Sequence, residues 1–177
     1  MQIEITPITY EMKSVLRNLL ELYEHDSSEF NGSELNEHGL YEYKYVDHYW
    51  TEEGRYAYFV RVDGKLAGFA LVRALESSEL GVLYSMSEFF IVRKFRRQGI
   101  GSRVAKLLFD MFPGRWEVSQ EAGNKDAQEF WKRVIGEFTQ GRFTMETSDS
   151  GPLLRFDSPF SDAEEHGQWD AEGDPVH

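Results

Sequence analysis

The feature that most constrains this chain is a strand-to-helix turn through two glycines, within the stretch from Glu88 to Phe112. The first part of this stretch, up to Val92, is aromatic and β-branched, which is typical of a fully buried strand. The second part repeats apolar residues at helical spacing: Val104, Leu107, Leu108 and Met111. The change from strand to helix falls on Gly99-Ile-Gly101, so the first amides of the helix lack partners within it and can bind an anion.

Basic side chains gather around this turn. No acidic residue occurs between Arg93 and Phe109, whereas six of the nineteen lysines and arginines of the chain lie there: Arg93, Lys94, Arg96, Arg97, Arg103 and Lys106. A chain with a net charge of −12 has no general reason to concentrate its arginines in one turn. The pattern therefore favours a phosphate ligand. The alternative is a basic helix start that only pairs with acidic neighbours.

Length and composition limit the remaining possibilities. A chain of 177 residues with 41% apolar content can bury one core, so we expect one domain over 1–157 and an acidic tail over 158–177. The absence of cysteine excludes disulfides and an acyl-cysteine route. The net charge argues against nucleic acid or an anionic membrane as the main partner, and no apolar run is long enough to span a bilayer. We expect a cytoplasmic protein, and the five histidines show no metal-ligand spacing.

The clearest local signal elsewhere is a hairpin. Tyr56–Val62 and Lys65–Ala74 read as strands, and Asp63-Gly64 between them is a strong turn signal. The other expected elements are, in chain order, an edge strand over 2–5, a helix over 10–25, an irregular acidic segment over 26–50, a polar connection over 76–81, a buried strand over 83–92, a strand over 115–119, a helix over 124–135 ended by Gly136, and a strand pair over 138–145 and 152–156.

The sequence resembles a known family at two motifs. Arg96-x-x-Gly99-x-Gly101, between an apolar strand and an amphipathic helix, is similar to the acetyl-coenzyme A signature of the GCN5-related N-acetyltransferase (GNAT) superfamily. The later motif of that family is matched in order and spacing by Asn124, Ala127, Phe130 and Trp131. Further segments resemble an uncharacterised subgroup of predicted acetyltransferases, which brings no substrate with it.

The resemblance implies a fold of the α/β (α+β) class. It would have a mixed, mostly antiparallel sheet of about seven strands flanked by about four helices, with the fourth and fifth strands splayed apart. In the family, the pantetheine arm lies in that gap along the edge of the fourth strand, and the pyrophosphate sits on the amides of the glycine turn. The implied coenzyme contacts are Phe89, Phe90, Ile91, Arg96, Arg97, Gln98, Gly99, Ile100, Gly101, Ser102, Asn124, Phe130 and Trp131.

The implied reaction is acetyl transfer from acetyl-CoA to an amine by direct attack in a ternary complex. An ammonium group has a pKa of about 10, so a base or a route to water must first take a proton. Glu88 and Glu117 are the candidate bases, and for each the alternative is a structural, ion-paired carboxylate. Strand alternation does not decide which faces the cleft, because relatives carry a bulge in the fourth strand.

Trp131 departs from the family pattern. Many relatives have a tyrosine there that protonates the leaving thiolate, and an indole cannot act as that acid. Another donor is then needed, such as Tyr41 or Tyr45. Because of this departure, a non-catalytic acyl-CoA-binding regulatory or interaction module remains an alternative function. A nucleotide-binding turn is a further alternative, but the glycine turn lacks the spacing of a Walker motif.

The acceptor is the least determined part. Ten acidic residues and one basic residue, Lys44, lie between Glu21 and Glu53, and their field would attract a cationic amine, although a solvated acidic surface is the alternative for any single carboxylate. We expect a small-molecule or protein amine as acceptor and a monomer or homodimer.

Overall fold

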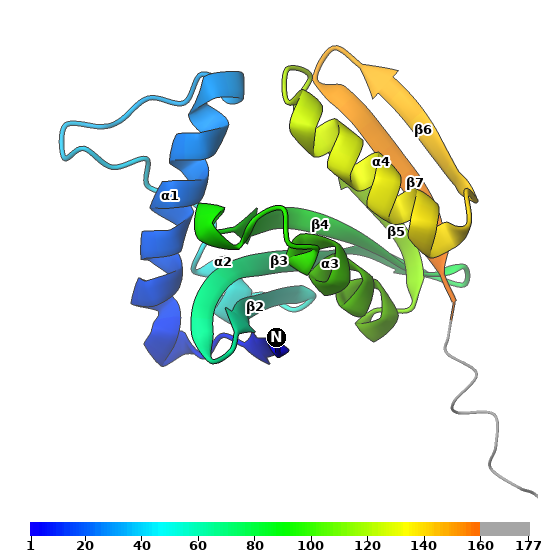
Figure 1. Cartoon of the computed structure of the whole chain (residues 1–177), viewed down its shortest axis with the longest axis horizontal. Helices are drawn as coiled ribbons and strands as arrows, with labels where there is room; N and C mark the ends of the chain where they lie inside the picture. Colours follow the sequence, from blue (N-terminus) through cyan, green and yellow to red (C-terminus); the bar gives the residue numbers. More distant parts are fainter. Residues whose placement is uncertain (160–177) are drawn as a thin grey trace, which may run out of the picture.

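The computed structural model describes residues 1–159, and these form one seven-stranded sheet with helices on both faces (Figure 1). The strand order is β1-β2-β3-β4-β5-β7-β6, and only the β4–β5 pair is parallel. The strands are β1 (Ile3–Pro7), β2 (Arg55–Val62), β3 (Lys65–Ser78), β4 (Gly81–Ile91), β5 (Gly114–Ser119), β6 (Phe143–Ser148) and β7 (Gly151–Ser158). The helices are α1 (Lys13–Asn31), α2 (His48–Thr51), α3 (Ile100–Met111) and α4 (Lys125–Thr139), with 3-10 turns at Tyr10–Met12 and Arg93–Phe95.

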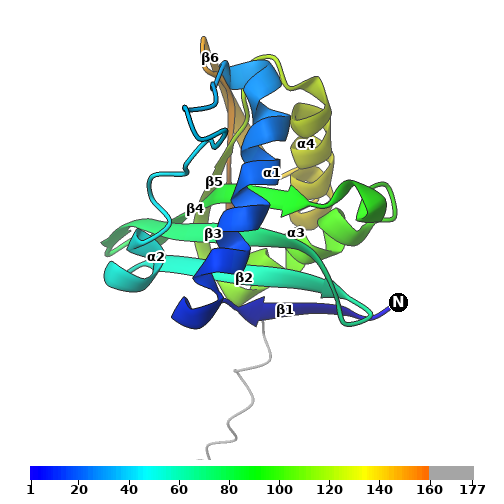
Figure 2. The same cartoon turned by 90° about the vertical axis from the view of Figure 1, so that its left-hand side faces the viewer.

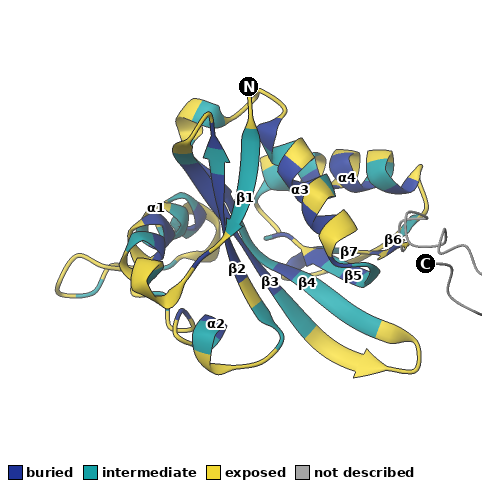
Figure 3. Ribbon diagram, turned by 90° about the horizontal axis from the view of Figure 1, so that it is seen from below, coloured by how far each residue is buried: buried dark blue, intermediate teal, exposed yellow. Residues whose placement is uncertain are grey.

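The two faces of the sheet carry separate apolar layers. Figure 3 shows α1 and α2 on one side of the sheet and α3 and α4 on the other. On the first side, α1 lies across β2, β3 and β4 (Figure 2) and buries Leu16 and Leu20 against Phe69 and Leu71. On the second side, Phe109 and Trp116 are at the centre of a larger cluster. The expected fold class and seven-stranded sheet are confirmed.

The parallel pair β4–β5 is splayed, as expected. The two strands pair only where Leu83, Tyr84 and Ser85 face Arg115, Trp116 and Glu117. Beyond Ser85, β4 continues to Ile91 and no strand of residues 1–159 pairs with it on its β5 side, while β5 pairs with β7. One edge of β4 is therefore left open where the strands diverge.

Several element bounds differ from the sequence-based ones. Helix α1 runs on to Asn31 instead of ending at His25, and Gly32 ends it in a left-handed conformation with its amide bonded to the Ser28 carbonyl. The carboxylate of Asp26 is held by two arginines, so this acidic stretch remains helical. Strand β3 extends to Ser78, through part of the expected polar connection.

Gly136 does not end the last helix. Helix α4 passes through it to Thr139 and is capped by Gln140, whose φ is 55°. Phe138, expected in a strand, lies in this extra helical turn and packs with ring centroids 5.2 Å from Phe109 and 6.2 Å from Phe156. This core contact outweighs the helix-breaking tendency of one glycine. Of the expected tail over 158–177, Ser158 is the last residue of β7 and is buried, and the residues from 160 onward lie outside the described part of the chain.

Candidate active site

A β-bulge in β4 decides which way the candidate base points. Val72 of β3 pairs with Met86, whereas the preceding Leu71 pairs with Glu88, so Ser87 is an extra residue in β4. Met86 faces the cluster beneath α3 and α4, and Leu71 lies in the cluster beneath α1. The bulge therefore turns Glu88 toward α1, a direction that simple alternation along the strand could not have given.

Glu88 lies in a largely buried, hydrogen-bonded position. Its Oε1 accepts a hydrogen bond of 3.1 Å from the Tyr43 hydroxyl, and the Tyr23 hydroxyl also lies against its carboxylate. Burial raises the pKa of Glu88 to about 7, because the two tyrosine hydrogen bonds only partly offset the loss of solvation, and the charges of Glu24 and Glu121 raise it further. A carboxyl with this pKa can accept a proton near neutral pH and release it again.

The tyrosines that meet Glu88 are not those considered from the sequence. Tyr23 lines the cleft described below, and Tyr43 reaches Glu88 from the segment between α1 and α2. Burial, followed by the charge of Glu88, raises the pKa of both phenols, so both stay neutral and can only donate to that carboxylate. Tyr41 instead lies within hydrogen-bond distance of Ser28 and His25, and Tyr45 is exposed. The only signal in the sequence for the contact between Tyr23 and Glu88 is the position of Tyr23 among the regularly spaced apolar residues of α1.

A cleft of about 420 Å³ opens where β4 and β5 diverge. Phe89 and Trp131 form an apolar part of its wall with ring centroids 5.1 Å apart, and Phe130 stacks on Phe89 at 6.0 Å. The residues lining it are Tyr23, Ser27, Met86, Ser87, Glu88, Phe89, Val118, Ser119, Gln120, Glu121, Asn124, Ala127, Trp131, Ser148, Ser150, Gly151, Pro152 and Leu153. The cleft thus joins the candidate base to the open edge of β4.

Glu117 is placed differently from Glu88. It lies opposite Ser85 in the short paired part of β4 and β5, and it does not line the cleft. Its Oε2 is 3.6 Å from Nε of Arg155 on the neighbouring strand β7. This is the ion-paired arrangement that was the alternative to a catalytic role.

The glycine turn presents a row of free amides. Within residues 1–159, the amides of Arg96 and Arg103 donate hydrogen bonds to backbone carbonyls, but none of the six amides from Arg97 to Ser102 does so. Arg97 and Gly99 have φ values of 58° and 75°, which turn the backbone at the start of α3. Successive unpaired amides at a helix start form a concave anion site.

The basic residues around the turn divide into two groups. Arg93 and Arg96 each place a guanidinium nitrogen 2.7 Å from the carboxylate of Asp26, and Nε of Arg96 donates to the Ile91 carbonyl at 2.6 Å. Arg96 thus braces the turn against α1. Lys106 pairs with Glu137, whereas the other three basic residues around the turn, Lys94, Arg97 and Arg103, make no ion pair within residues 1–159. The charge at the turn is only partly compensated by acidic neighbours.

The other predicted contact residues surround this turn and the cleft. The Oδ1 of Asn124 accepts from the Ala127 amide at 3.0 Å and caps α4. A β-carbon at Gly101 would come within 3.3 Å of the Phe130 ring, so a small residue is needed for α4 to pack on the start of α3. Ile100 is fully buried, Phe90 packs toward α1, and the Gln98 side-chain amide donates to the Lys94 carbonyl.

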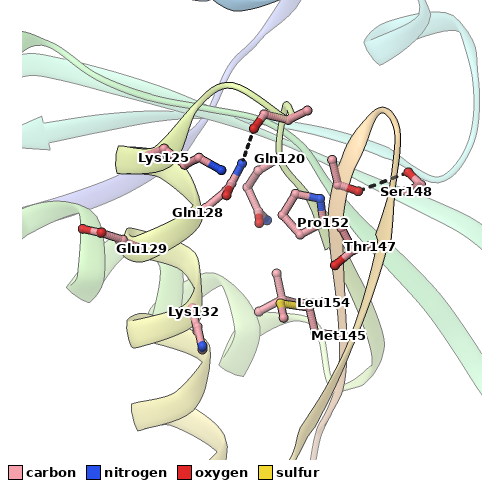
Figure 4. A pocket seen from close by; sticks show the side chains of 12 residues that line it. Gln120, Lys125, Gln128, Glu129, Lys132, Met145, Thr147, Ser148, Pro152 and Leu154 are labelled. Carbon is pink, nitrogen blue, oxygen red and sulfur yellow. Dashed lines mark hydrogen bonds between the residues drawn. The ribbon is translucent and has the colours of Figure 1, made fainter.

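A second hollow of about 350 Å³ lies between α4 and the strands β6 and β7 (Figure 4). Lys125, Gln128 and Lys132 line it from the helix. It shares Gln120, Ser148, Gly151 and Pro152 with the cleft, so these residues lie between the two hollows. Within residues 1–159, no helix is both long and apolar enough to cross a membrane, and no three acidic or histidine side chains cluster as metal ligands would.

Comparison with known proteins identifies the family. A family model described as the acetyltransferase (GNAT) family matches residues 19–136, about two thirds of the chain. The chain belongs to the GNAT acetyltransferase family. The match begins in α1 and ends in α4, so it includes the glycine turn, the open edge of β4 and most residues that line the cleft of this GNAT chain, but not those from β6 and β7. No curated protein matches it.

Solved structures share the GNAT fold at low identity. An acetyltransferase from Thermus thermophilus superposes with a TM-score of 0.64 at 14% identity, covering 88% of this chain and 95% of that one. PaiA N-acetyltransferase from Thermoplasma acidophilum, solved in complex with coenzyme A, gives 0.58 at 13% identity, with 89% and 99% covered. An aminoglycoside acetyltransferase, also with coenzyme A, gives 0.59 at 15% identity, with 88% and 95% covered. At these identities the likeness supports the fold alone.

Proposed function

We propose that this chain is an N-acetyltransferase that takes the acetyl group from acetyl-CoA and transfers it to an amine in a ternary complex. The observation that carries the proposal is the combination, in one GNAT-family domain, of six free amides at a helix start with an unpaired strand edge leading from them to a buried carboxylate. Two structures with the same fold were solved with coenzyme A, which supports this choice of donor.

The chain's own groups fit such a ligand. The amides from Arg97 to Ser102 would hold the pyrophosphate, and the uncompensated charges of Arg97 and Arg103 would add to the attraction. The edge of β4 from Phe89 to Ile91 would accept an amide-containing chain as an added strand. Phe89, Phe130 and Trp131 would exclude water beside it.

Glu88 is the residue that we assign as the base. When bound, acetyl-CoA supplies a thioester carbon, which a neutral amine nitrogen attacks, forming the N–C bond as the S–C bond breaks. Glu88 accepts the proton that the nitrogen loses, and Tyr23 and Tyr43 hold its carboxylate in place. Because a thiol has a pKa of about 8.5, the sulfur can take a proton from the protonated Glu88 or from water, without a tyrosine at 131.

The test is release of free coenzyme A thiol, corrected for hydrolysis, across a panel of amines. At least one amine should raise thiol release, Glu88→Gln should suppress the rise, and Glu117→Gln should leave most of it. If acetyl-CoA binds and no amine raises thiol release, the enzyme assignment is wrong.

One observation favours a second candidate, a non-catalytic acyl-CoA-binding module. Trp131 lines the cleft and its indole cannot protonate a leaving group. Binding of acetyl-CoA with unchanged thiol release in every arm of the same panel would support this candidate.

A further inference from the structure

The segment between α1 and α2, residues 32–47, carries Tyr43 to the candidate base but has few ties of its own. Figure 1 shows it leaving the end of α1, looping away from the domain and returning beside the helix to α2. The hydrogen bonds around Asn36 all stay within the segment. The place of Tyr43, whose hydroxyl donates to Glu88 at 3.1 Å, therefore depends on how its neighbours in the chain are held.

Glu21 of α1 binds the backbone directly before Tyr43. Its Oε2 accepts a hydrogen bond from the Tyr41 amide at 2.8 Å, and its Oε1 accepts one from the Glu42 amide at 3.0 Å. These are the only hydrogen bonds that the backbone of residues 34–44 makes to another part of the described chain. Because the two oxygens of one carboxylate hold two successive amides, they fix both the position and the direction of the chain.

The backbone at Glu42 is strained where it is held. Its φ is 52°, in the left-handed region that a residue with a β-carbon adopts only at a cost in free energy. Such a conformation persists where surrounding contacts determine it, and the Glu42 amide is itself one of the two that Glu21 binds. Without that contact the strained turn would relax, and Tyr43, the next residue, would move with it.

We propose that Glu21 is a positioning residue for Glu88. By binding two backbone amides it keeps the Tyr43 hydroxyl on the Glu88 carboxylate, while within residues 1–159 it forms no hydrogen bond of its own with either side chain. Tyr23, the other phenol at Glu88, is held by the helix that carries it, so only Tyr43 needs such an anchor. The inference rests on the proposed function for the role of Glu88 as base, whereas the positioning itself requires no reaction.

The hydroxyl of Tyr43 matters because its hydrogen bond favours the charged form of Glu88. Burial is the main cause that raises the pKa of Glu88 to about 7, and the hydrogen bonds from the two tyrosines lower it. Loss of the Tyr43 hydroxyl, with its ring left in place, should therefore raise this pKa. The titratable groups that face Glu88 come from each element around it: Tyr23 and Glu24 of α1, Tyr43, Tyr49 of α2, and Glu121 after β5.

The test is a double-mutant cycle that follows the titration of Glu88. Its carboxyl carbon is observed by NMR in protein labelled with carbon-13 at the glutamate carboxyls, and the signal is assigned by its loss in Glu88→Gln. In the parent chain, Tyr43→Phe should raise the midpoint by about one pH unit, because a hydrogen bond to a charged group contributes about that much. In Glu21→Ala the same substitution should shift the midpoint by less than about a third of a unit, because the hydroxyl is no longer held there.

The matched control is Glu29→Ala. Glu29 is an exposed residue on the same helix, and its side chain takes part in no hydrogen bond or ion pair within residues 1–159. In this background Tyr43→Phe should keep its full shift, although the net charge changes as it does in Glu21→Ala. An equal shift in all three backgrounds, or no shift in the parent, would overturn the proposal.

Amide hydrogen exchange of the parent chain tests the anchor without any substitution. The amides of Tyr41 and Glu42 should exchange more slowly than those of Glu37 and Lys44, which donate no hydrogen bond within the described chain. Equal exchange at all four amides would show that Glu21 does not hold this backbone, and the proposal would be rejected even if Glu21→Ala did not fold.

Neither measurement needs a substrate, so the positioning and the proposed function fail separately. If the two substitutions are coupled but no amine raises thiol release, the proposed function is wrong and the positioning stands. If an amine raises thiol release and the substitutions act independently, the reverse holds. Where both are found, the pH limb of thiol release should move with the Glu88 titration in each variant, while the KM for acetyl-CoA, whose amide turn lies on the other face of the sheet, stays unchanged.

Discussion

At the scale of single residues, the raised pKa of the buried Glu88 carboxyl is the property on which the proposed chemistry depends. The Glu88 carboxyl lies near Phe90 and Tyr23 and loses hydration, and within residues 1–159 its side-chain hydrogen-bond partners are the phenols of Tyr23 and Tyr43, which stabilise the charged form without neutralising it. Cationic neighbours would have pushed its pKa down. Its actual surroundings hold the pKa near 7, where a base is half ionised at neutral pH.

The rate of acetyl transfer should depend on the protonation state of Glu88. Glu88 must be ionised to accept a proton, so thiol release with a saturating amine should rise through a limb with a midpoint near pH 7. Tyr23, Tyr43, Glu24 and Glu121 face this group and set that midpoint. Glu88→Gln should lower kcat by about 10² to 10⁴-fold and abolish the limb. A limb that persists in the glutamine variant would show that another group titrates.

The same shift predicts how stability depends on pH. The pKa of Glu88 is higher in the folded chain, at about 7, than its ordinary value of 4.5, so the folded state holds this proton more tightly. Its contribution to the free energy of unfolding is therefore full below about pH 4.5 and is lost as the pH rises through 7. Urea unfolding of the parent and Glu88→Gln should show the difference between them shifting in this direction, and a constant difference from pH 4 to 8 would contradict the assigned shift.

At the scale of elements, the turn before α3 depends on backbone that only glycine adopts easily. Gly99 has a φ of 75° and a β-carbon there would touch nothing, so substitution tests the backbone alone. Gly32, which ends α1, is matched in both respects, with a φ of 70° and open space around it. Gly99 lies beside the free amides at the start of α3, whereas Gly32 lies at the end of α1.

Replacing each of these glycines by alanine should therefore separate stability from binding. Both variants should lose about 1 kcal/mol of unfolding free energy, because a left-handed φ is unfavourable for alanine. Only Gly99→Ala should also weaken coenzyme A binding, by roughly tenfold or more, since it displaces the free amides. Isothermal titration measures the affinity, and equal affinities in the two variants would remove the turn from the binding site.

The presence of each helix and strand could be predicted from the sequence more accurately than the residues at which it begins and ends. The glycine turn, the Asp63-Gly64 hairpin and the amphipathic pattern of α3 are local signals, and each led to the right element. The end of α1 was missed because the arginine pairs of Asp26 are long-range contacts, and the end of α4 because Phe138 is held by distant rings. The family resemblance indicated a bulge in the fourth strand, but its position at Ser87, which orients Glu88, follows from the register with β3 and could not be predicted from the residues.

At the scale of the whole molecule, the site needs both faces of the sheet. The helix α1 and the α1–α2 segment bring Tyr23 and Tyr43 to Glu88, while α3 carries the amide turn on the opposite face. The splayed pair β4–β5 is the element that lets one ligand reach both. Loss of the core that joins α3 to β5 should therefore disturb the entire site.

Phe109 tests that dependence. It is fully buried, with ring centroids 5.0 Å from Trp116 and 4.8 Å from Phe156, so Phe109→Ala should cost about 3 to 5 kcal/mol of unfolding free energy. Leu107 on the same helix is 44% exposed, and Leu107→Ala should cost less than about 1 kcal/mol. Urea denaturation of both variants measures the difference, and similar losses would mean that α3 does not depend on this core.

The most direct measurement of the central claim is a calorimetric titration of the parent chain with coenzyme A, paired with its melting temperature. We predict one binding site per chain, weaker binding at higher salt, and at a hundredfold excess over Kd a stabilisation of about 2.7 kcal/mol. No heat of binding and an unmoved melting temperature would contradict it, because the free amides and the open strand edge would then have no ligand of this kind.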